Sequence, residues 1–305
     1  MCNVVAANAV TGECTARRDP ARWDGRPGHP PIPGPVQYRP GVADETLRDG
    51  LDFTGKVAIV TGGCRGVGRG ITERFLAAGA DVVICCRHEP EVAPAAGGRT
   101  AAFIEADVRD PDQIDAVVAF TKERFGRLDV LVNNAGGAPP ADSATVSPKF
   151  TTAIVTLNLI APFVFAQRAF AVMNEQPDGG VIVNISSVSG IRPSPGTAAY
   201  GAAKAGLINL TQTLGLEFAP KVRVVCVTVG LVRTEQAHLF YGDEDGVRAV
   251  GATVPAGRMA EPTDVGDVCV LLASPLARYV TGEHVVVHGG GEWPAYLQAA
   301  KNTRG

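Results

Sequence analysis

Apolar runs alternate with helical patterns along most of this chain, and this rhythm constrains the fold more than any other feature. The runs typical of strands lie at 56–61, 81–86, 100–106, 128–133, 181–186, 222–229 and 284–288. Helical spacing of apolar residues fills most of the intervals, and Asp110-Pro111 is typical of a helix start. Strands that are apolar throughout indicate a parallel sheet covered on both faces. We therefore predict an α/β fold, a single-domain Rossmann-type doubly wound parallel sheet of seven strands.

The rhythm occupies residues 51–291 of the 305, and we expect this range to form the one domain. Residues 1–50 are rich in proline and lack periodicity. We expect them to form an N-terminal extension that is disordered or packs as an arm on a neighbouring subunit. Residues 292–305 form a C-terminal tail.

The composition excludes several classes of partner. A net charge of −3 offers no surface for nucleic acid or anionic membranes. The longest uncharged run, 150–167, contains threonines, Asn158 and Pro162, so we interpret it as a buried helix.

The seven cysteines include no CxxC pair and no Cys/His cluster at zinc spacing, so we expect no metal. Four of them lie in apolar runs and are interpreted as buried thiols of a cytoplasmic protein: Cys85, Cys86, Cys226 and Cys269.

A glycine-rich stretch follows the first strand and opens the first helix. Such glycines let the backbone approach a pyrophosphate, which the N–H groups of the helix N-terminus then bind. The expected cofactor residues here are Thr61, Gly62, Gly63, Arg65, Gly66, Val67 and Gly68. Because this loop lies after a strand and before a helix, near the start of the βαβ rhythm, it predicts a dinucleotide site.

The end of the second strand bears on which dinucleotide binds. An NAD site places an acidic residue there for the ribose 2′-OH. This chain has Cys86 followed by Arg87, with Arg65 in the glycine loop. Two guanidinium groups suit a 2′-phosphate. We predict NADP as the preferred cofactor, with NAD as the alternative.

A serine, a tyrosine and a lysine provide the candidate chemistry. Tyr200 and Lys204 lie four residues apart in a helical pattern, so both side chains are on one helix face. A neighbouring ammonium favours the phenolate, and we expect it to bring the pKa of Tyr200 towards neutrality for acid–base catalysis. Ser187 ends the fifth strand and is expected to hydrogen-bond the same substrate oxygen.

With these features placed, the chain resembles the short-chain dehydrogenase/reductase family over residues 53–291. The resemblance rests on the glycine loop, the Asn133–Gly136 stretch, Asn158, Ser187, and Tyr200 with Lys204. It implies a catalytic tetrad in which Tyr200 exchanges the proton, Ser187 polarises the carbonyl, and Lys204 lowers the tyrosine pKa and holds the nicotinamide ribose. Asn158 would anchor a water molecule linked to Lys204. The resemblance also implies cofactor contacts from Asp107, Val108, Asn134, Ala135, Gly136, Gly230, Val232 and Thr234.

Three residues depart from the family pattern: Val229 replaces a proline, His288 an aspartate and Phe150 a tryptophan. Residues 235–256 form the variable loop, which we expect to act as a mobile lid. Its aromatic stem predicts a bulky apolar substrate, contacted by His238, Phe240 and Tyr241 as well as Ser187.

The leading hypothesis is therefore an NAD(P)-dependent oxidoreductase acting on a secondary alcohol or ketone, either hydroxysteroid-like or another cyclic ketone. A 3-oxoacyl-thioester reductase is an alternative, and a non-catalytic nucleotide-binding regulator is an alternative of another class. Helix 150–173 is apolar nearly all round, and relatives pair it with the Tyr200 helix across a two-fold axis. We thus expect a homotetramer or homodimer.

Overall fold

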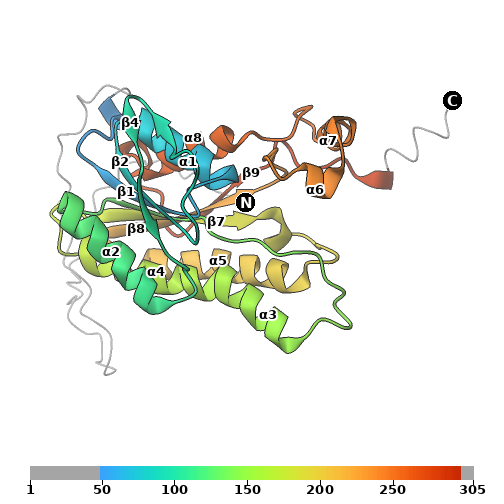
Figure 1. The fold of residues 1–305 in the computed structure, drawn as a ribbon, viewed down its shortest axis with the longest axis horizontal. Coiled ribbons are helices and arrows are strands. Elements are labelled where there is room, and N and C mark those ends of the chain that lie inside the picture. The colour runs from blue at the N-terminus through green and yellow to red at the C-terminus, as the bar shows by residue number, and fades with distance from the viewer. Residues whose placement is uncertain (1–48, 297–305) are drawn as a thin grey trace, which may run out of the picture. The chain divides into compact units, whose positions relative to one another are not determined.

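Seven parallel strands form the central sheet of the structure, a computed structural model that describes residues 49–296 except for the side chain of Phe240. Residues 1–48 of the expected N-terminal extension and 297–305 of the tail lie outside this range; the last two residues of the extension belong to a 3₁₀-helix, η1 (Asp49–Leu51). The strand order is β5-β2-β1-β6-β7-β8-β9 (Figure 1). The strands are β1 (Val57–Thr61), β2 (Asp81–Cys86), β5 (Ala102–Glu105), β6 (Val130–Asn133), β7 (Gly180–Ser187), β8 (Val222–Val229) and β9 (His284–Val287).

The predicted fold class is confirmed by this sheet. Every residue of β1 and of β6 is buried, because helices cover both faces of the sheet. A small antiparallel pair, β3 (Ala95–Ala96) with β4 (Arg99–Thr100), was not predicted. Two residues per strand are too few to produce a recognisable period.

Two layers of helices enclose the sheet (Figure 1). On one face, α1 and α8 pack against each other and share a core with the strands. On the other face, α2, α4 and α5 cover a second core that includes Phe165 and Leu214. The helices are α1 (Gly66–Ala77), α2 (Pro111–Phe125), α3 (Pro148–Val155), α4 (Ala161–Met173), α5 (Ala198–Glu217), α6 (His238–Tyr241), α7 (Glu244–Gly251) and α8 (Pro262–Ala273).

Helix α2 begins and ends where its sequence indicates. The Asp110 carboxylate accepts a hydrogen bond from the Asp112 N–H at 3.0 Å, and Pro111 occupies the first turn. Gly126 ends the helix at φ 74°, a conformation that glycine adopts without steric cost. These local signals place the strand that follows, β6, and therefore the polar residues at its end.

The helical run Pro148–Met173 is long and apolar enough to cross a membrane by length and composition alone. Within the described fold its inward side chains, Ile154, Phe165 and Met173, are buried beneath the sheet. The run is interrupted by a π-turn, η2 (Thr156–Ile160), with Asn158 fully buried at its centre. Such turns are frequent at functional sites.

The prediction for the cysteines is partly wrong. Cys85, Cys226 and Cys269 are free and buried as expected. Cys86 instead forms a disulfide with Cys64, with Cα atoms 6.6 Å apart. The sequence spacing of 22 residues gave no sign of this pairing, which depends on the strand and loop lying side by side.

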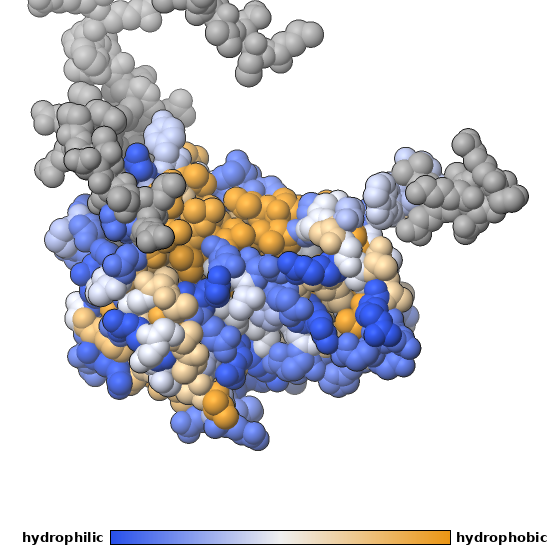
Figure 2. Space-filling view, turned by 90° about the horizontal axis from the view of Figure 1, so that it is seen from above, coloured by the Kyte–Doolittle hydropathy of each residue, from blue (hydrophilic) through white to orange (hydrophobic). Residues whose placement is uncertain are grey.

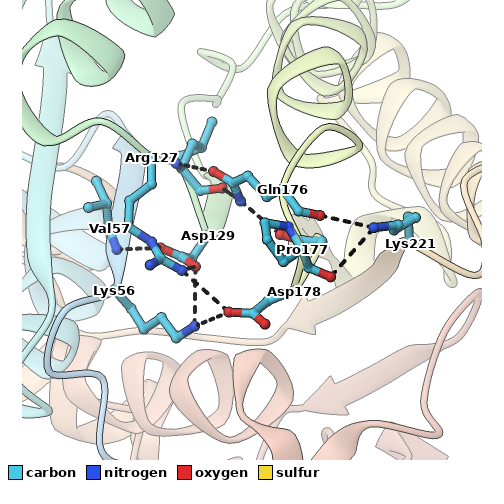
Figure 3. A network of polar contacts seen from close by, with 10 residues as sticks. Lys56, Val57, Arg127, Asp129, Gln176, Pro177, Asp178 and Lys221 are labelled. Atoms are coloured by element: carbon cyan, nitrogen blue, oxygen red, sulfur yellow. Dashed lines mark hydrogen bonds and ion pairs between the residues drawn. The ribbon is translucent and has the colours of Figure 1, made fainter.

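A network of charged and amide groups joins the loops that precede four strands (Figure 3). Asp129 is buried; its carboxylate accepts hydrogen bonds from the Val57 N–H at 2.9 Å and from the Arg127 guanidinium at 2.6 and 2.7 Å. The Gln176 side chain bonds to the backbone of Leu128, and Lys221 donates to the Gln176 carbonyl. This network fixes the amino ends of β1, β6, β7 and β8.

We predict that Asp129→Asn lowers the free energy of unfolding by about 2 kcal/mol, because a buried charged acceptor of several hydrogen bonds is lost. Urea unfolding monitored by circular dichroism measures this change. The matched control is Asp178→Asn, whose exposed carboxylate pairs with Lys56 at 3.2 Å and should contribute less than about 1 kcal/mol. Equal losses in the two variants would contradict the structural role given to Asp129.

Candidate active site

The sheet order places the site at the carboxyl ends of β1 and β6, where chain connections leave in opposite directions. In open α/β sheets this switch point is where ligands bind. The glycine loop lies here between β1 and α1. A Cβ on Gly68 would lie 2.2 Å from the Gly62 carbonyl oxygen, so only glycine permits this approach of helix and loop. The loop geometry therefore fits the predicted pyrophosphate site.

Hydrogen bonds to Thr61 join the glycine loop to the end of β6. The Thr61 hydroxyl oxygen accepts from the N–H groups of Asn134 and Ala135, each at 2.9 Å. The Asn134 amide donates to the Thr61 carbonyl at 2.9 Å. The structure thus brings the cofactor residues predicted after β1 and those predicted after β6 into direct contact.

The expected adenosine end lies at the carboxyl ends of β2 and β5. Arg65 and Arg87 are both exposed, and Arg87 acts electrostatically on the Asp107 carboxylate. A hydrogen bond from Arg109 holds the pKa of Asp107 below its usual value. Val108 is buried beside it. These groups surround the place where an adenosine would lie in this fold class.

Glu235 was not singled out from the sequence, yet it contacts the helix end that would hold phosphate. Its carboxylate accepts a hydrogen bond from the Gly66 N–H, at the N-terminus of α1, at 2.9 Å. The neighbouring Thr234 lies 3.5 Å from the position of a Cβ on Gly66. A carboxylate is a suitable anion for the positive end of a helix. Glu235 thus occupies an anion position at the end of α1.

Asn158 is held by three hydrogen bonds at the π-turn. Its amide donates to the carbonyls of Ile154 at 2.9 Å and Gly137 at 3.0 Å, and its oxygen accepts from the Gly137 N–H at 2.9 Å. A Cβ on Gly136 would lie 2.6 Å from the Asn158 oxygen and 3.1 Å from the Lys204 ammonium nitrogen. Glycine at 136 therefore allows Asn158 and Lys204 to approach the same backbone segment.

Lys204 is almost completely buried, with 3% of its surface exposed. Its ammonium donates to the Ile185 carbonyl at 2.8 Å and lies 5.6 Å from the centre of the Tyr200 ring. Burial lowers the pKa of Lys204 to about 8, because the charged form loses its hydration. The ammonium is thus held at the site by β7 and by its own helix, α5.

The pKa of Tyr200 differs from the sequence-based expectation. Burial raises it, and a hydrogen bond with Ser187 opposes the increase. The Lys204 ammonium donates to the Ile185 carbonyl and does not offset this increase. The structure brings Ser187 and Tyr200 together, and the raised pKa leaves the Tyr200 phenol protonated near neutral pH.

Two cavities lie near these groups. One, of about 310 Å³, is lined by Tyr200 and mostly by apolar residues, among them Pro139, Val146, Phe150 and Ile154. The other, of about 580 Å³, is lined by charged residues that include Arg233, Glu235 and Glu244. The first is suited to an apolar ligand beside the phenol, and the second to polar groups beside the glycine loop.

The variable loop is more regular than expected, since it contains α6 and α7. Ala237 and Val247 of this loop form a small apolar cluster with Met259, which follows the loop, and Tyr241 packs against it. Sequence reasoning missed these helices because each spans eight residues or fewer. His238 lines the charged cavity. Phe240 belongs to α6, but its side chain lies outside the described part of the structure.

Tyr241 of this loop lies near a contact between two other segments. Arg192, after the serine strand, pairs with Glu292 in the tail at 2.5 Å. Both charges act on the Tyr241 phenol. This arrangement brings the variable loop, the Ser187 strand end and the start of the tail to one region. Val229 and His288, two of the residues that depart from the family pattern, lie at the ends of β8 and β9. Val229 pairs with Val287, and His288 packs against Gly230.

Comparisons with known proteins find one matching family model and several similar proteins. Residues 62–292 match the family model described as Enoyl-(Acyl carrier protein) reductase. A 3alpha-hydroxysteroid dehydrogenase of Mediterraneibacter gnavus is 36% identical, over 77% of this chain and 96% of that protein. L-fucose dehydrogenase of Oryctolagus cuniculus is 35% identical, over 81% and 88%. The crystal structure of a short-chain type dehydrogenase/reductase from Mycobacterium marinum is 30% identical, with a TM-score of 0.75 over 82% of this chain and 100% of that one.

We predict that Tyr200→Phe lowers kcat by about 10²–10⁴-fold, because we expect the phenol beside Ser187 to be the proton-exchanging group. Cofactor binding, measured by fluorescence titration, should be retained. Tyr279→Phe is the control, since Tyr279 is fully exposed. Turnover like that of the unmodified protein in Tyr200→Phe would remove Tyr200 from the catalytic set.

We predict that Glu235→Gln tightens binding of a dinucleotide about five-fold, because the competing negative charge leaves the end of α1 while the amide oxygen still accepts a hydrogen bond. Isothermal titration calorimetry measures the change. Glu244→Gln is the matched control, since it removes a charge from the same cavity at a residue paired with Arg233. Equal changes of the dissociation constant in both variants would mean that the net charge of the cavity, and not the contact of Glu235 with α1, governs binding.

Proposed function

Because the chain belongs to the short-chain dehydrogenase/reductase family, oxidoreductases that act on CH–OH groups and the corresponding carbonyls, we propose that it transfers a hydride between NADP and a bulky, apolar secondary alcohol or ketone. The observation that carries the proposal is the Tyr200 phenol, which is paired with Ser187 and lines an apolar cavity. A non-catalytic regulator would have no use for this arrangement.

In the proposed reaction Tyr200 exchanges a proton with the substrate oxygen while the nicotinamide supplies or accepts the hydride. For ketone reduction the phenol O–H donates to the oxygen that becomes the alcohol. Ser187 holds that oxygen by donating its hydroxyl hydrogen. Lys204 and Asn158 are positioned at Gly136, where Lys204 is the proposed support for the nicotinamide ribose. The raised pKa of Tyr200 keeps its proton available near neutral pH, which favours reduction in that range.

NADP is proposed as the cofactor because two guanidinium groups lie at the adenosine end. Neither Cys86 nor Arg87 offers the carboxylate that an NAD ribose would use. The Arg65 side chain is exposed and makes no hydrogen bond or ion pair among residues 49–296, so its guanidinium is available to a 2′-phosphate. NAD remains the alternative. The other residues that we propose to contact the cofactor, from Thr61 to Thr234, lie at or after the carboxyl ends of β1, β5, β6 and β8.

A bulky apolar substrate is supported by the lining of the cavity at Tyr200. Its volume of about 310 Å³ is within the range of small-molecule sites. The similarity to a hydroxysteroid dehydrogenase points to the same class. A sugar is the second candidate, supported by the similarity to L-fucose dehydrogenase and by the charged cavity beside His238.

We also infer that the enzyme is a cytoplasmic homotetramer or homodimer. On the faces of the helices around Asn158 and Tyr200, Ile160 is 45% exposed and Leu216 is 82% exposed. Apolar residues also gather on the face shown in Figure 2, where α1 and α8 lie; Leu271 of α8 is exposed. Association of identical copies would cover such surfaces. A monomeric mass by light scattering at micromolar concentration would count against this inference.

The proposed function is tested by a turnover screen with NADPH and NADH over steroid ketones, small cyclic ketones, 3-oxoacyl thioesters and aldoses. We expect the highest kcat/KM with NADPH and a steroid or other bulky cyclic ketone. A preference for aldoses would support the second candidate. Turnover confined to thioesters would overturn both.

The cofactor preference is tested separately with Arg87→Asp. We expect the ratio of kcat/KM for NADPH to that for NADH to fall about ten-fold or more, because an anionic phosphate would meet a carboxylate. Arg278→Asp, on the loop after α8, is the control for a general change of charge. An unchanged ratio in Arg87→Asp would remove the basis for NADP.

A further inference from the structure

The disulfide between Cys64 and Cys86 has no part in the reaction described above. Cys64 lies in the glycine loop, and Cys86 is the last residue of β2. The bond therefore joins two elements that bound the adenosine end of the cofactor site. Each cysteine immediately precedes one of the two arginines proposed to bind a 2′-phosphate, Arg65 and Arg87.

The bridged cysteines differ from the other cysteines of the described chain in their access to solvent. Cys85, Cys226 and Cys269 are buried, and burial raises the pKa of the Cys85 thiol to about 12 and that of Cys226 to about 11. Cys64 and Cys86 are only partly buried. A reagent in solution can reach them far more readily, and exposed disulfides are the more easily reduced ones.

The fold does not depend on this bond to place the glycine loop. The Gly62 N–H donates to the Cys85 carbonyl at 2.8 Å, which already joins the loop to β2. The Thr61 hydroxyl and the Asn134 amide fix the loop to the other side. Strands β1 and β2 pair along their whole length, from Val57 with Asp81 to Thr61 with Cys85. Reduction should therefore leave the sheet intact and act locally.

We propose that Cys64 and Cys86 form a reversible thiol–disulfide couple that sets how tightly the adenosine end binds its cofactor, with the reduced form binding more tightly. The inference rests on the proposed function. The bridge fixes the separation between the residues that carry Arg65 and Arg87. When it is open, the loop at Cys64 can adjust so that both guanidinium groups reach one phosphate. A cytoplasmic protein with a disulfide commonly uses it in this regulatory way.

The chemistry requires a dithiol reductant. One thiolate of the reductant attacks a sulfur of the bridge, forming a mixed disulfide and releasing the other cysteine as a thiolate. The second thiolate of the reductant then breaks the mixed disulfide. Two electrons pass to Cys64 and Cys86, both sulfurs take up a proton, and the reductant leaves as its own disulfide. Re-oxidation by a disulfide such as oxidised glutathione reverses the exchange.

The bridge is located by peptide mapping of the full-length protein without reductant. Trypsin cleaves after lysine and arginine, so the bond should join peptide 57–65 to peptide 75–87. The second peptide also contains Cys85. The linked pair must therefore disappear in Cys86→Ser, and it must disappear again after treatment with dithiothreitol.

The effect on binding is measured with NADPH and with adenosine 2′,5′-bisphosphate, which carries only the adenosine end. We expect dithiothreitol to lower both dissociation constants at least ten-fold relative to protein treated with oxidised glutathione. Cys64→Ser and Cys86→Ser should bind like the reduced protein in both conditions. Cys269→Ser is the matched control, because it removes a buried free thiol of α8 and should respond as the unmodified protein does.

Three results would overturn the proposal. No linked peptide after oxidation would exclude the bond, and a dissociation constant that changes less than two-fold would exclude its effect on binding. Tighter binding in the oxidised form would reverse the direction and overturn it as well. Equal binding in a protein that still reduces ketones would leave the proposed function intact. A redox effect on binding without turnover of any substrate would instead contradict the proposed function alone.

Discussion

The hydrogen bonds of the Thr61 hydroxyl are the contacts on which the site depends. Two backbone N–H groups, from Asn134 and Ala135, donate to this one oxygen. They fix the end of β6 against the glycine loop, and Gly136 follows directly. Because Gly136 has no side chain, Asn158 and Lys204 can both approach it. The loop for the cofactor and the groups for the chemistry are thus positioned by one side chain of β1.

Buried polar groups behind this edge give the site its rigidity. The Asn133 amide donates to the Asn184 oxygen at 2.9 Å, and the Asn184 amide donates to the Thr211 hydroxyl at 2.9 Å. These two hydrogen bonds connect β6 to β7 and β7 to α5, the helix that carries Tyr200 and Lys204. Every fully buried side-chain polar atom in the described residues has a hydrogen-bond partner. A buried polar network satisfied in this way specifies one arrangement of strands and helix, whereas an apolar core tolerates several.

The sequence was sufficient to predict the strands of the sheet, but it did not predict contacts between segments that are distant in the chain. Strands such as β1 and β6 are apolar up to their last residue, and the Asp110-Pro111 start of α2 uses local capping, so these elements were predictable. The family resemblance identified Asn158 and Gly136. It did not reveal that Asn158 and Lys204 both lie so close to Gly136 that a side chain there would clash with them. The Cys64–Cys86 bond, the contact of Glu235 with Gly66, and the direction of the Tyr200 pKa shift all depend on tertiary packing. The helices of the variable loop are too short for periodicity to reveal.

The carboxylate of Glu235 also bears on how the protein chooses among anions. Because the end of α1 already holds an internal anion, a solute must displace that group rather than fill a vacant positive site. A simple ion such as inorganic phosphate, with one point of attachment, gains little from the exchange. A dinucleotide attaches at several places along the sheet edge and can offset the displacement. We therefore expect Glu235 to favour a dinucleotide over abundant small anions at the end of α1.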